Sequence, residues 1–224
     1  MTEMTGKAGA EAPEACADDA LSDAFLAARE RDLKKRLKRR RFEHVLGVSD
    51  TAASLAEAYG ANVRKARLAG LLHDWDKDFD DDGIRARARA LGVDEGIDPY
   101  VFESMPRLLH GPTAAAALRE EFPCIPDDVL QAVARHTAAA IGMSDLDMII
   151  YIADAIEPSR RFGGLDRLRA AAGTVPLEEL FMMTFNHILL TLVERRRRLH
   201  PATVEVWNHY VSRSREAAGG KGTA

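Results

Sequence analysis

The sequence has few cysteines, few aromatic side chains and no long hydrophobic run. Its 224 residues include only two cysteines, Cys16 and Cys124, too few for a disulfide framework or a cysteine-based zinc site. Such cysteine usage is typical of a reducing compartment. The apolar run that begins at Ile149 ends at Asp154, far short of the roughly 20 apolar residues that span a bilayer. The sequence therefore predicts a protein without a membrane span.

The N-terminal region lacks the apolar segment of a signal peptide. Residues 1–23 carry Lys7 against the acidic side chains of Glu3, Glu11, Glu14, Asp18, Asp19 and Asp23. We therefore expect a cytoplasmic protein. Large apolar side chains are almost absent from residues 1–20 and from the end of the chain, so burial cannot offset the entropy of ordering there. This composition predicts a disordered acidic tail over residues 1–23 and a second disordered tail over 217–224.

The sequence also lacks a strong excess of one charge. Lys and Arg number 31 against 35 Asp and Glu, a formal net charge of −4, which argues against a general nucleic-acid coat. Two basic runs remain, Arg29–Arg41 and Arg195–Arg198. They could bind RNA or an anionic surface or guide a polyanionic substrate, but such runs are more often solvated helix faces. Leu33 and Leu37, four residues apart, favour a docked helix whose charges face water.

Helical periodicity fills the chain between the two tails, and no stretch alternates with period two. Apolar residues from Phe42 to Tyr59 recur at three- and four-residue steps and predict a helix that Gly60 ends. Asn62 can cap a second helix that runs to Leu72. Further helices are expected from Asp82 or Gly83 to Leu91, over 113–122, 127–137 and 148–156, and after Pro176 and Pro201. The sequence predicts an all-α bundle forming a single domain over residues 24–216.

Two acidic positions stand out in apolar surroundings. His73 and Asp74 are adjacent at the end of an apolar helix, where an imidazole and a carboxylate can share one divalent cation. Asp154 lies within the apolar string IIYIADAIEP, and a buried carboxylate is costly unless it meets a cation or strong donors. Taken alone, Asp154 is equally well explained as a residue on the surface of a helix or as the ion-pair partner of Arg160. A single His-Asp dipeptide is common by chance.

The set His44, His73, Asp74 and Asp154 is distributed over three expected helices and resembles the H…HD…D pattern of the HD superfamily of metal-dependent phosphohydrolases. Wider strings narrow the resemblance: RRFEHVLGVSDTAASLAEAYG, ARLAGLLHDWDKDF, LLHGPTAAAALREEF, AVARHT and IIYIADAIEPSRRFGGLDRLR. Together these strings are similar to the YqeK family, HD-domain hydrolases that cleave diadenosine tetraphosphate symmetrically, and the similarity covers roughly Leu33 to Tyr210. The chain departs from this pattern at Trp75 and Asp76 and in its acidic tail, none of which is a ligand position.

The resemblance implies an HD-domain helical bundle and a metal centre. It assigns the ligand role to His44, His73, Asp74 and Asp154 and implies a divalent metal, iron by family expectation, as one or two ions. His110 and His136 are placed in the same cavity, where they either complete a second metal site bridged by Asp74 or contact phosphate directly. The catalytic positions implied are Asp74, Lys77, His110 and His136.

The resemblance also implies which residues meet the substrate. Lys77, three residues after Asp74 and expected on the same helix face, can place an ammonium on a phosphate oxygen. Thr137 can donate a hydroxyl, and the Arg160 fork suits a phosphate bidentately. The segment Leu199–His200–Pro201 matches the family's turn before the last helix, which reaches the nucleotide. The full substrate set is His44, Lys77, His110, His136, Thr137, Asp154, Arg160, Leu199, His200 and Pro201.

The chemistry implied is attack of a metal-activated water on the polyphosphate, giving two ADP molecules. The partner expected is thus a small-molecule dinucleoside polyphosphate, with no membrane and no nucleic acid, and the sequence leaves a homodimer open. Two alternatives remain. One is another HD-domain phosphohydrolase, acting on a nucleoside mono- or triphosphate or a cyclic dinucleotide. The other is a non-catalytic nucleotide- or RNA-binding HD module, which would be expected to have lost ligands. His187, within an apolar stripe, is expected to be a hydrogen-bonded core or interface histidine.

Overall fold

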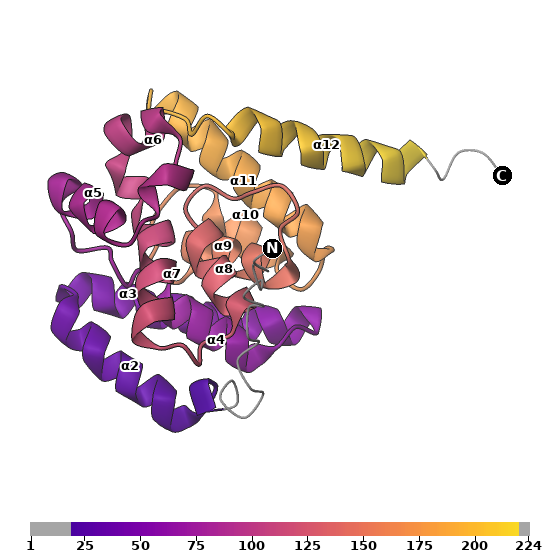
Figure 1. The fold of residues 1–224 in the computed structure, drawn as a ribbon. Helices are drawn as coiled ribbons and strands as arrows, with labels where there is room; N and C mark the ends of the chain where they lie inside the picture. The colour runs from indigo at the N-terminus through magenta and orange to yellow at the C-terminus, as the bar shows by residue number, and fades with distance from the viewer. Residues whose placement is uncertain (1–18, 220–224) are drawn as a thin grey trace, which may run out of the picture.

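A computed structural model describes residues 19–219, with side chains through residue 213, and every regular element in that range is a helix (Figure 1). The all-α expectation is confirmed. None of the described helices is long and apolar enough to cross a bilayer. The helices are α2 (Asp23–Arg36), α3 (Arg39–Tyr59), α4 (Val63–Leu72), α5 (Asp81–Ala90), α6 (Pro99–Ser104), α7 (His110–Glu121), α8 (Asp127–Arg135), α9 (Asp145–Ile156), α10 (Leu165–Ala171), α11 (Leu177–Glu194) and α12 (Thr203–Gly219), with short 3₁₀ turns η1 (Asp94–Gly96) and η2 (Pro106–Leu108).

Both ends of the described chain extend beyond the expected domain of residues 24–216. Ala20 is fully buried, and the Ser22 hydroxyl caps α2 by accepting the Phe25 amide at 3.1 Å. At the other end, α12 continues to Gly219 and projects from the bundle (Figure 1). Composition could not place the first boundary, because alanine fits a small space in a segment without large apolar side chains. Most of the two expected tails, residues 1–18 and 220–224, lies outside the described residues.

The capping residues recognised in the sequence end and begin the helices as expected. Gly60 ends α3 in the left-handed conformation at φ 71°, and the Asn62 side chain accepts the Lys65 amide at 3.1 Å to start α4. Ser144 and Asp147 form the predicted capping box of α9. α5 begins at Asp81, slightly earlier than expected, because the Asp80 carboxylate caps it. The short helices α6 and α10 were not expected, since few residues carry little periodicity.

Two hydrophobic clusters hold the helices. The main one extends from Ala20 to Tyr210 and packs α3, α4, α8, α9 and α11 together, with Val45, Leu68, Leu72, Ile149, Ile152 and Phe181 fully buried. A smaller cluster joins α5, α6 and the residues before α7, and contains Ile84, Ala88, Val101, Phe102 and Leu109. The smaller cluster fixes the start of α7, where His110 is the first helical residue.

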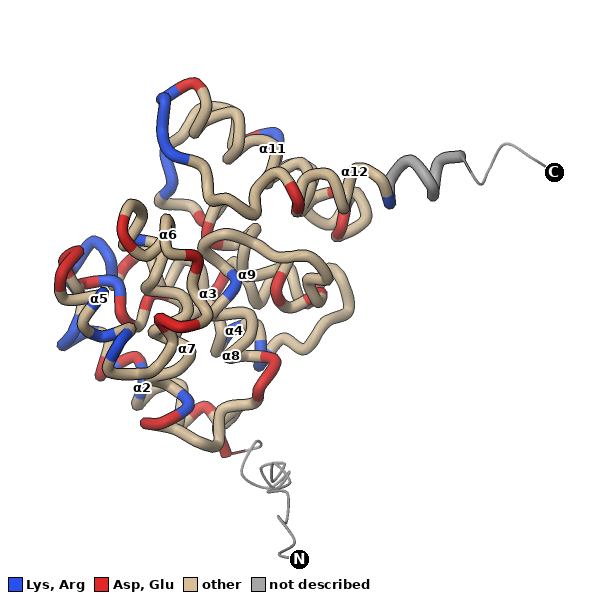
Figure 2. Tube along the Cα trace, turned by 45° about the horizontal axis from the view of Figure 1, so that its top comes forward, with Lys and Arg blue, Asp and Glu red and all other residues tan. Residues whose placement is uncertain are grey.

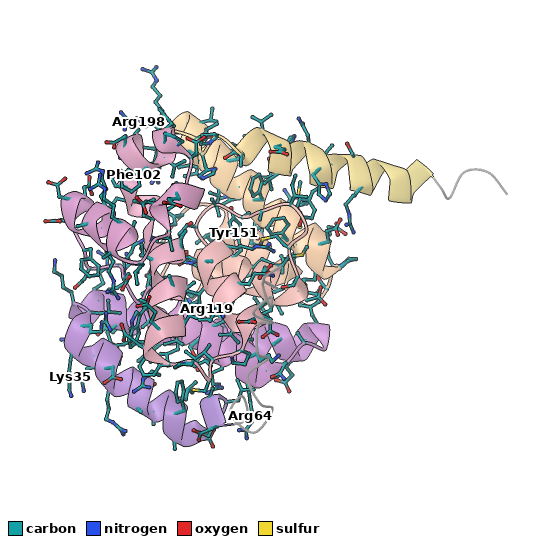
Figure 3. All side chains as sticks on the ribbon, viewed as in Figure 1. Lys35, Arg64, Phe102, Arg119, Tyr151 and Arg198 are labelled. Atoms are coloured by element: carbon teal, nitrogen blue, oxygen red, sulfur yellow. The ribbon has the colours of Figure 1, made fainter. Side chains whose placement is uncertain are left out.

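The basic run at the start of the chain docks on the bundle. Leu33 is buried and Leu37 nearly so, as the spacing predicted. The guanidinium of Arg29 lies 3.9 Å from the centre of the Phe122 ring, and that of Arg36 lies 4.1 Å from the buried Trp75 ring. Lys35 points away from the bundle (Figure 3). The basic side chains of this run are therefore partly solvated and partly engaged with aromatic rings. Figure 2 marks the positions of Lys and Arg along the chain in blue.

Helices α3 and α4 approach closely at Gly70. A Cβ atom on Gly70 would lie 2.9 Å from the Ser49 Cα and 3.1 Å from the Val48 carbonyl oxygen, so only glycine fits. The Ser49 hydroxyl also donates to the Arg67 carbonyl at 2.8 Å. This contact sets His44 on α3 beside His73 at the end of α4.

We expect Gly70→Ala to lower the free energy of unfolding by about 1–3 kcal/mol, the usual cost of forcing a methyl group into a packed interior. Urea denaturation followed by circular dichroism measures the change. Gly96→Ala is the matched control, because a Cβ there meets open space, and it should stay within about 0.5 kcal/mol. If both variants are equally stable, α3 and α4 do not meet at Gly70.

Candidate metal centre and its cavities

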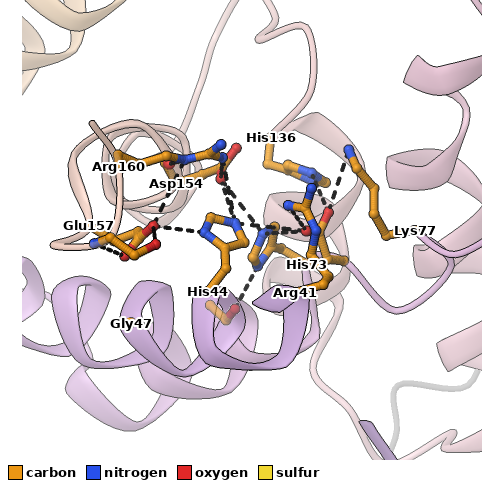
Figure 4. A network of polar contacts seen from close by, with 12 residues as sticks. Arg41, His44, Gly47, His73, Lys77, His136, Asp154, Glu157 and Arg160 are labelled. Carbon is orange, nitrogen blue, oxygen red and sulfur yellow. Dashed lines mark hydrogen bonds and ion pairs between the residues drawn. The ribbon is translucent and has the colours of Figure 1, made fainter. Parts of the chain in front are cut away.

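A cluster of four side chains forms where the chain leaves α4. His73 and Asp74 are both buried at this point, and His44 from α3 and Asp154 from α9 face them (Figure 4). His44 Nε2 lies 3.0 Å from Asp154 Oδ1 and 3.8 Å from Asp74 Oδ2. His73 Nε2 lies 3.4 Å from Asp74 Oδ2 and 3.8 Å from Asp154 Oδ1. The structure thus brings the four residues of the H…HD…D pattern together.

A second group lies on the other side of the same carboxylate. His110 Nε2 is 3.1 Å and His136 Nε2 is 3.9 Å from Asp74 Oδ1. Asp74 therefore turns Oδ2 toward His44 and His73, and Oδ1 toward His110 and His136. A carboxylate in this position can bridge two ions, and each group could hold one.

In each of the four histidines, Nδ1 has a hydrogen-bond acceptor. Nδ1 lies 2.6 Å from the Gly70 carbonyl in His73, 2.6 Å from the Arg107 carbonyl in His110, and 2.7 Å from the Val133 carbonyl in His136. In His44 it lies 2.9 Å from Glu157 Oε1. Since these oxygens accept, Nδ1 carries the hydrogen and each neutral ring keeps its Nε2 lone pair for the cluster.

The free lone pairs fit a divalent cation. Among the described residues, His73 Nε2 is buried and has no hydrogen-bond partner. His110 Nε2 and His136 Nε2 face each other at 3.0 Å, an arrangement of two lone pairs that a positive charge stabilises. Lys77 places its ammonium 3.1 Å from His110 Nε2. Imidazole nitrogens combined with carboxylate oxygens are the ligands that first-row transition metals prefer.

The charges of the cluster also suit metal binding, which needs ionised carboxylates and neutral imidazoles. Burial lowers the pKa of His110 and takes the pKa of His136 well below its ordinary value. Burial alone would raise the pKa of Asp74 and of Asp154, but His73 beside Asp74 and His44 beside Asp154 hold both well below the usual range. His73 differs: burial acts to lower its pKa, but Asp74, Asp154 and the Gly70 carbonyl together raise it. A cation therefore competes with a proton at this ring.

Three cationic side chains surround the cluster. Arg41 donates to Asp74 Oδ2 at 2.8 Å. Lys77 lies 3.8 Å from Asp74 Oδ1, but through a turn and not through a shared helix face. The expected helix is wrong here, since α4 ends at Leu72 and the Lys77 amide donates to the Asp74 carbonyl at 3.0 Å. Arg160 donates to the backbone carbonyl of Asp154 at 2.8 Å and also binds its carboxylate. Asp154 thus has the Arg160 pair considered from the sequence as well as its contact with His44.

Sequence reasoning missed Arg41 and Glu157. Arg41 was counted in a run expected to face water, although its place three residues before His44 sets both on one face of α3. Glu157 appeared only within the string IIYIADAIEPSRRFGGLDRLR and was given no role. It is buried, and it contacts a histidine 113 positions earlier in the chain, a distance at which periodicity gives no signal.

Two cavities adjoin the cluster. One has a volume of about 430 Å³ and lies against α9 and α11; its lining includes Asp154, His110 and His136, apolar residues such as Tyr151, Ile188 and Leu192, and the cations Arg195 and Arg197. The other, of about 560 Å³, is lined by basic side chains and His44; the basic residues are Lys38, Arg40, Arg41, Lys77, Arg107, Arg160 and Arg161. Both cavities share Lys77, Arg107, Arg160 and Phe162.

The remaining expected site residues lie at different distances from the cluster. Thr137 lines the 430 Å³ cavity, and so does His187, which was expected in the core or at an interface. His200 lines a smaller cavity of about 110 Å³ that shares Thr137 and Tyr151 with the larger one. Its neighbours Leu199 and Pro201 are not among the residues that line these three cavities.

Comparison with known proteins agrees with this arrangement. The family model of the HD domain matches residues 41–159. A symmetrical bis(5'-nucleosyl)-tetraphosphatase from Halalkalibacterium halodurans is 35% identical over 79% of this chain and 91% of its own length. The enzyme of the same name from Bacillus subtilis is 31% identical over 81% of this chain and 95% of its own. A solved structure from Clostridium acetobutylicum, a predicted HD superfamily hydrolase involved in NAD metabolism, is 34% identical, has a TM-score of 0.77, and is matched over 84% of this chain and 97% of its own.

We expect Asp74→Ala and Asp154→Ala each to lose bound divalent metal while the protein keeps its helical circular dichroism. Each change removes a charged oxygen from the cluster, and losses even outside the ligand shell cost about 10–100-fold in affinity or activity. Metal content by emission spectrometry after dialysis measures the effect. A variant that retains the wild-type metal content would show that its carboxylate is not a ligand.

Proposed function

The chain belongs to the HD-domain family of symmetrical bis(5'-nucleosyl)-tetraphosphatases, and we propose that it hydrolyses diadenosine tetraphosphate to two ADP with the help of a divalent metal. The observation that carries the proposal is the position of Asp74. Its two oxygens face two separate histidine groups, and two cavities that share Lys77, Arg107, Arg160 and Phe162 adjoin the cluster. A substrate with two similar arms can therefore lie across the cluster with its centre at the metal.

The proposed ligands of the first ion are His44, His73, Asp74 and Asp154. We assign His110 and His136, with Asp74 as the bridge, to a second ion. Iron is the metal we propose from the resemblance to the family, and the mixed imidazole and carboxylate ligands are compatible with it. When bound, the ion acts as a Lewis acid toward phosphate and lowers the pKa of water.

The protein's own cations supply the rest of the charge compensation. Lys77 and Arg160 line both cavities. Each can therefore reach a phosphate at the centre of the substrate's polyphosphate. Arg160 Nε and Nη2 donate to Asp154, so its remaining donors can bind phosphate from a fixed position, whereas Lys77 acts as a point charge. Arg41, which binds Asp74 Oδ2, adds a third cation. As the central anhydride breaks, these groups are already in place to stabilise the charge that develops.

The two cavities suggest how the substrate is held. The 430 Å³ cavity has apolar walls for a nucleoside, with the Thr137 hydroxyl as a hydrogen-bond donor, and His200 lies in the small cavity beside it. Leu199 and Pro201 act through the turn that carries His200. The basic walls of the 560 Å³ cavity suit the other phosphates. The proposed partner is thus a small-molecule dinucleoside polyphosphate.

Two other functions remain for comparison. Another HD-domain phosphohydrolase activity, on a nucleoside mono- or triphosphate or a cyclic dinucleotide, would use the same metal ligands and is separated by a substrate screen. A non-catalytic nucleotide- or RNA-binding module is disfavoured because every expected metal-ligand position still carries a histidine or an aspartate. We propose a cytoplasmic location from the sparse cysteines. Light scattering distinguishes a monomer from the homodimer that the sequence allows.

We expect ADP to be the only early product from diadenosine tetraphosphate. Ion-exchange chromatography of early time points measures the products. Equal amounts of ATP and AMP would contradict symmetric cleavage. Enzyme shown to be free of metal should be inactive, and full activity without metal would contradict the metal-dependent mechanism.

We expect Lys77→Met and Arg160→Met to keep the wild-type metal content but to lower kcat/KM by roughly 10- to 150-fold. An ammonium and a guanidinium have no lone pair for a metal, and a hydrogen bond to a charged group contributes about 1.5–3 kcal/mol. Arg160→Lys should recover only part of the loss, because one point charge cannot replace a fork. Loss of metal in step with loss of rate would assign both residues to the structure of the site.

A further inference from the structure

Glu157 has a contact in the site that neither the ligand set nor the phosphate-binding set explains. It lies just after α9, and its carboxylate is buried against α3 beside His44 (Figure 4). Glu157 Oε1 lies 2.9 Å from His44 Nδ1, the nitrogen that points away from the cluster. The carboxylate therefore meets a proposed metal ligand on the side opposite to the metal.

Both oxygens of this carboxylate are held in place. The Ser159 hydroxyl donates to Oε1 at 2.5 Å, and the Ser159 amide donates to Oε2 at 2.7 Å. Arg169 from α10 fixes the backbone of the turn by donating to the carbonyls of Ile156, Glu157 and Arg160 at 2.8–3.0 Å. A carboxylate fixed in this way sets the direction of the ring that donates to it.

Gly47 makes room for the carboxylate. It lies one turn after His44 on α3, and a Cβ atom there would lie 2.7 Å from Glu157 Oε2. The next nearest atoms are also from Glu157, its Cδ at 3.5 Å and its Cβ at 3.7 Å. Alanine would stabilise the middle of a helix better than glycine does. A glycine at this position is therefore explained by the space that Glu157 needs.

The position of His44 explains why it needs this partner. His73 and His136 lie at helix C-termini and His110 follows a 3₁₀ turn, so the carbonyl three residues earlier is free to accept from Nδ1. His44 lies inside α3, where the carbonyls are used by the helix itself. Its acceptor has to come from another element, and Glu157 supplies it.

We propose that Glu157 is a positioning residue that holds His44 in the orientation and tautomer needed to bind metal, and that Gly47 provides the space for its carboxylate. The proposal rests on the metal role of His44 proposed above. Groups that accept from the far nitrogen of a metal-binding histidine typically contribute about 10–100-fold to metal affinity.

The test measures Mn²⁺ affinity of the metal-free full-length protein from the electron paramagnetic resonance signal of free Mn²⁺. Glu157→Ala should raise the Kd for Mn²⁺ by about 10–100-fold. Glu157→Gln should raise it less, because its amide oxygen can still accept from Nδ1. Glu179→Gln, on the exposed face of α11, is the matched control and should leave the Kd unchanged.

A double-mutant cycle tests the part assigned to Gly47. Gly47→Ala alone should weaken Mn²⁺ binding by displacing the carboxylate, although alanine favours the helix. In the Glu157→Ala background the same change should add less than about a 2-fold loss, since the added methyl group no longer meets an oxygen. Losses that simply multiply in the double variant would show that Gly47 does not act through Glu157 and would overturn its role.

The possible outcomes distinguish failure of the positioning role of Glu157 from failure of the proposed metal centre. Thermal unfolding of each variant shows whether a loss of Mn²⁺ affinity comes only from a loss of folding. If Glu157→Ala does not fold, Glu157→Gln, which keeps the shape of the side chain, provides the test. If Asp154→Ala loses Mn²⁺ while both Glu157 variants bind it like the wild type, the positioning role is wrong and the metal centre stands. If the wild type does not bind Mn²⁺, both are wrong.

Discussion

The buried carboxylate of Asp74 is the interaction on which the rest of the site depends. An ionised carboxylate in a protein interior is costly unless cations and donors compensate it. Here the compensation comes from Arg41 at 2.8 Å and Lys77 at 3.8 Å, while His73 and His110 turn Nε2 lone pairs toward the same carboxylate, where a bound cation would complete it. These residues belong to α3, to the end of α4 and its turn, and to α7. The close packing of α3 on α4 thus has a second effect besides stability. It brings Arg41 near Asp74 and so lowers the free-energy cost of burying this carboxylate.

Helix ends determine where such a cluster can form. The last carbonyls of a helix have no partner within it, so a histidine at that end can donate Nδ1 to the carbonyl three residues earlier and direct Nε2 outward. His73 and His136 both use this contact, at the ends of α4 and α8. The metal-binding geometry is therefore a consequence of where helices stop. A small shift in either helix end would change both the fold and the direction of a ligand.

Much of this arrangement could be predicted from local sequence signals. Gly60 and Asn62 set the boundary between α3 and α4, and the H…HD…D spacing identified the clustered residues. Lys77 was placed near Asp74 for the wrong reason, because periodicity assumes that a helix continues and cannot detect a turn that begins at its cap. Glu157 could not be found in this way, since its contact joins α3 to the end of α9 and depends on packing between elements distant in the chain.

A symmetrical substrate would meet a site that is not symmetrical. Cations line both cavities, but apolar side chains such as Ile188 and Leu192 line only the first, and basic side chains predominate in the second. Burial would hold a nucleoside in the first with little dependence on salt, whereas charges would hold phosphates in the second, and salt screens the exposed ones among them. Lys77 and Arg160 line both cavities beside the proposed metal ligands, where screening is weakest. The two halves of such a substrate would thus depend on these forces to different degrees, with the shared cations near its centre.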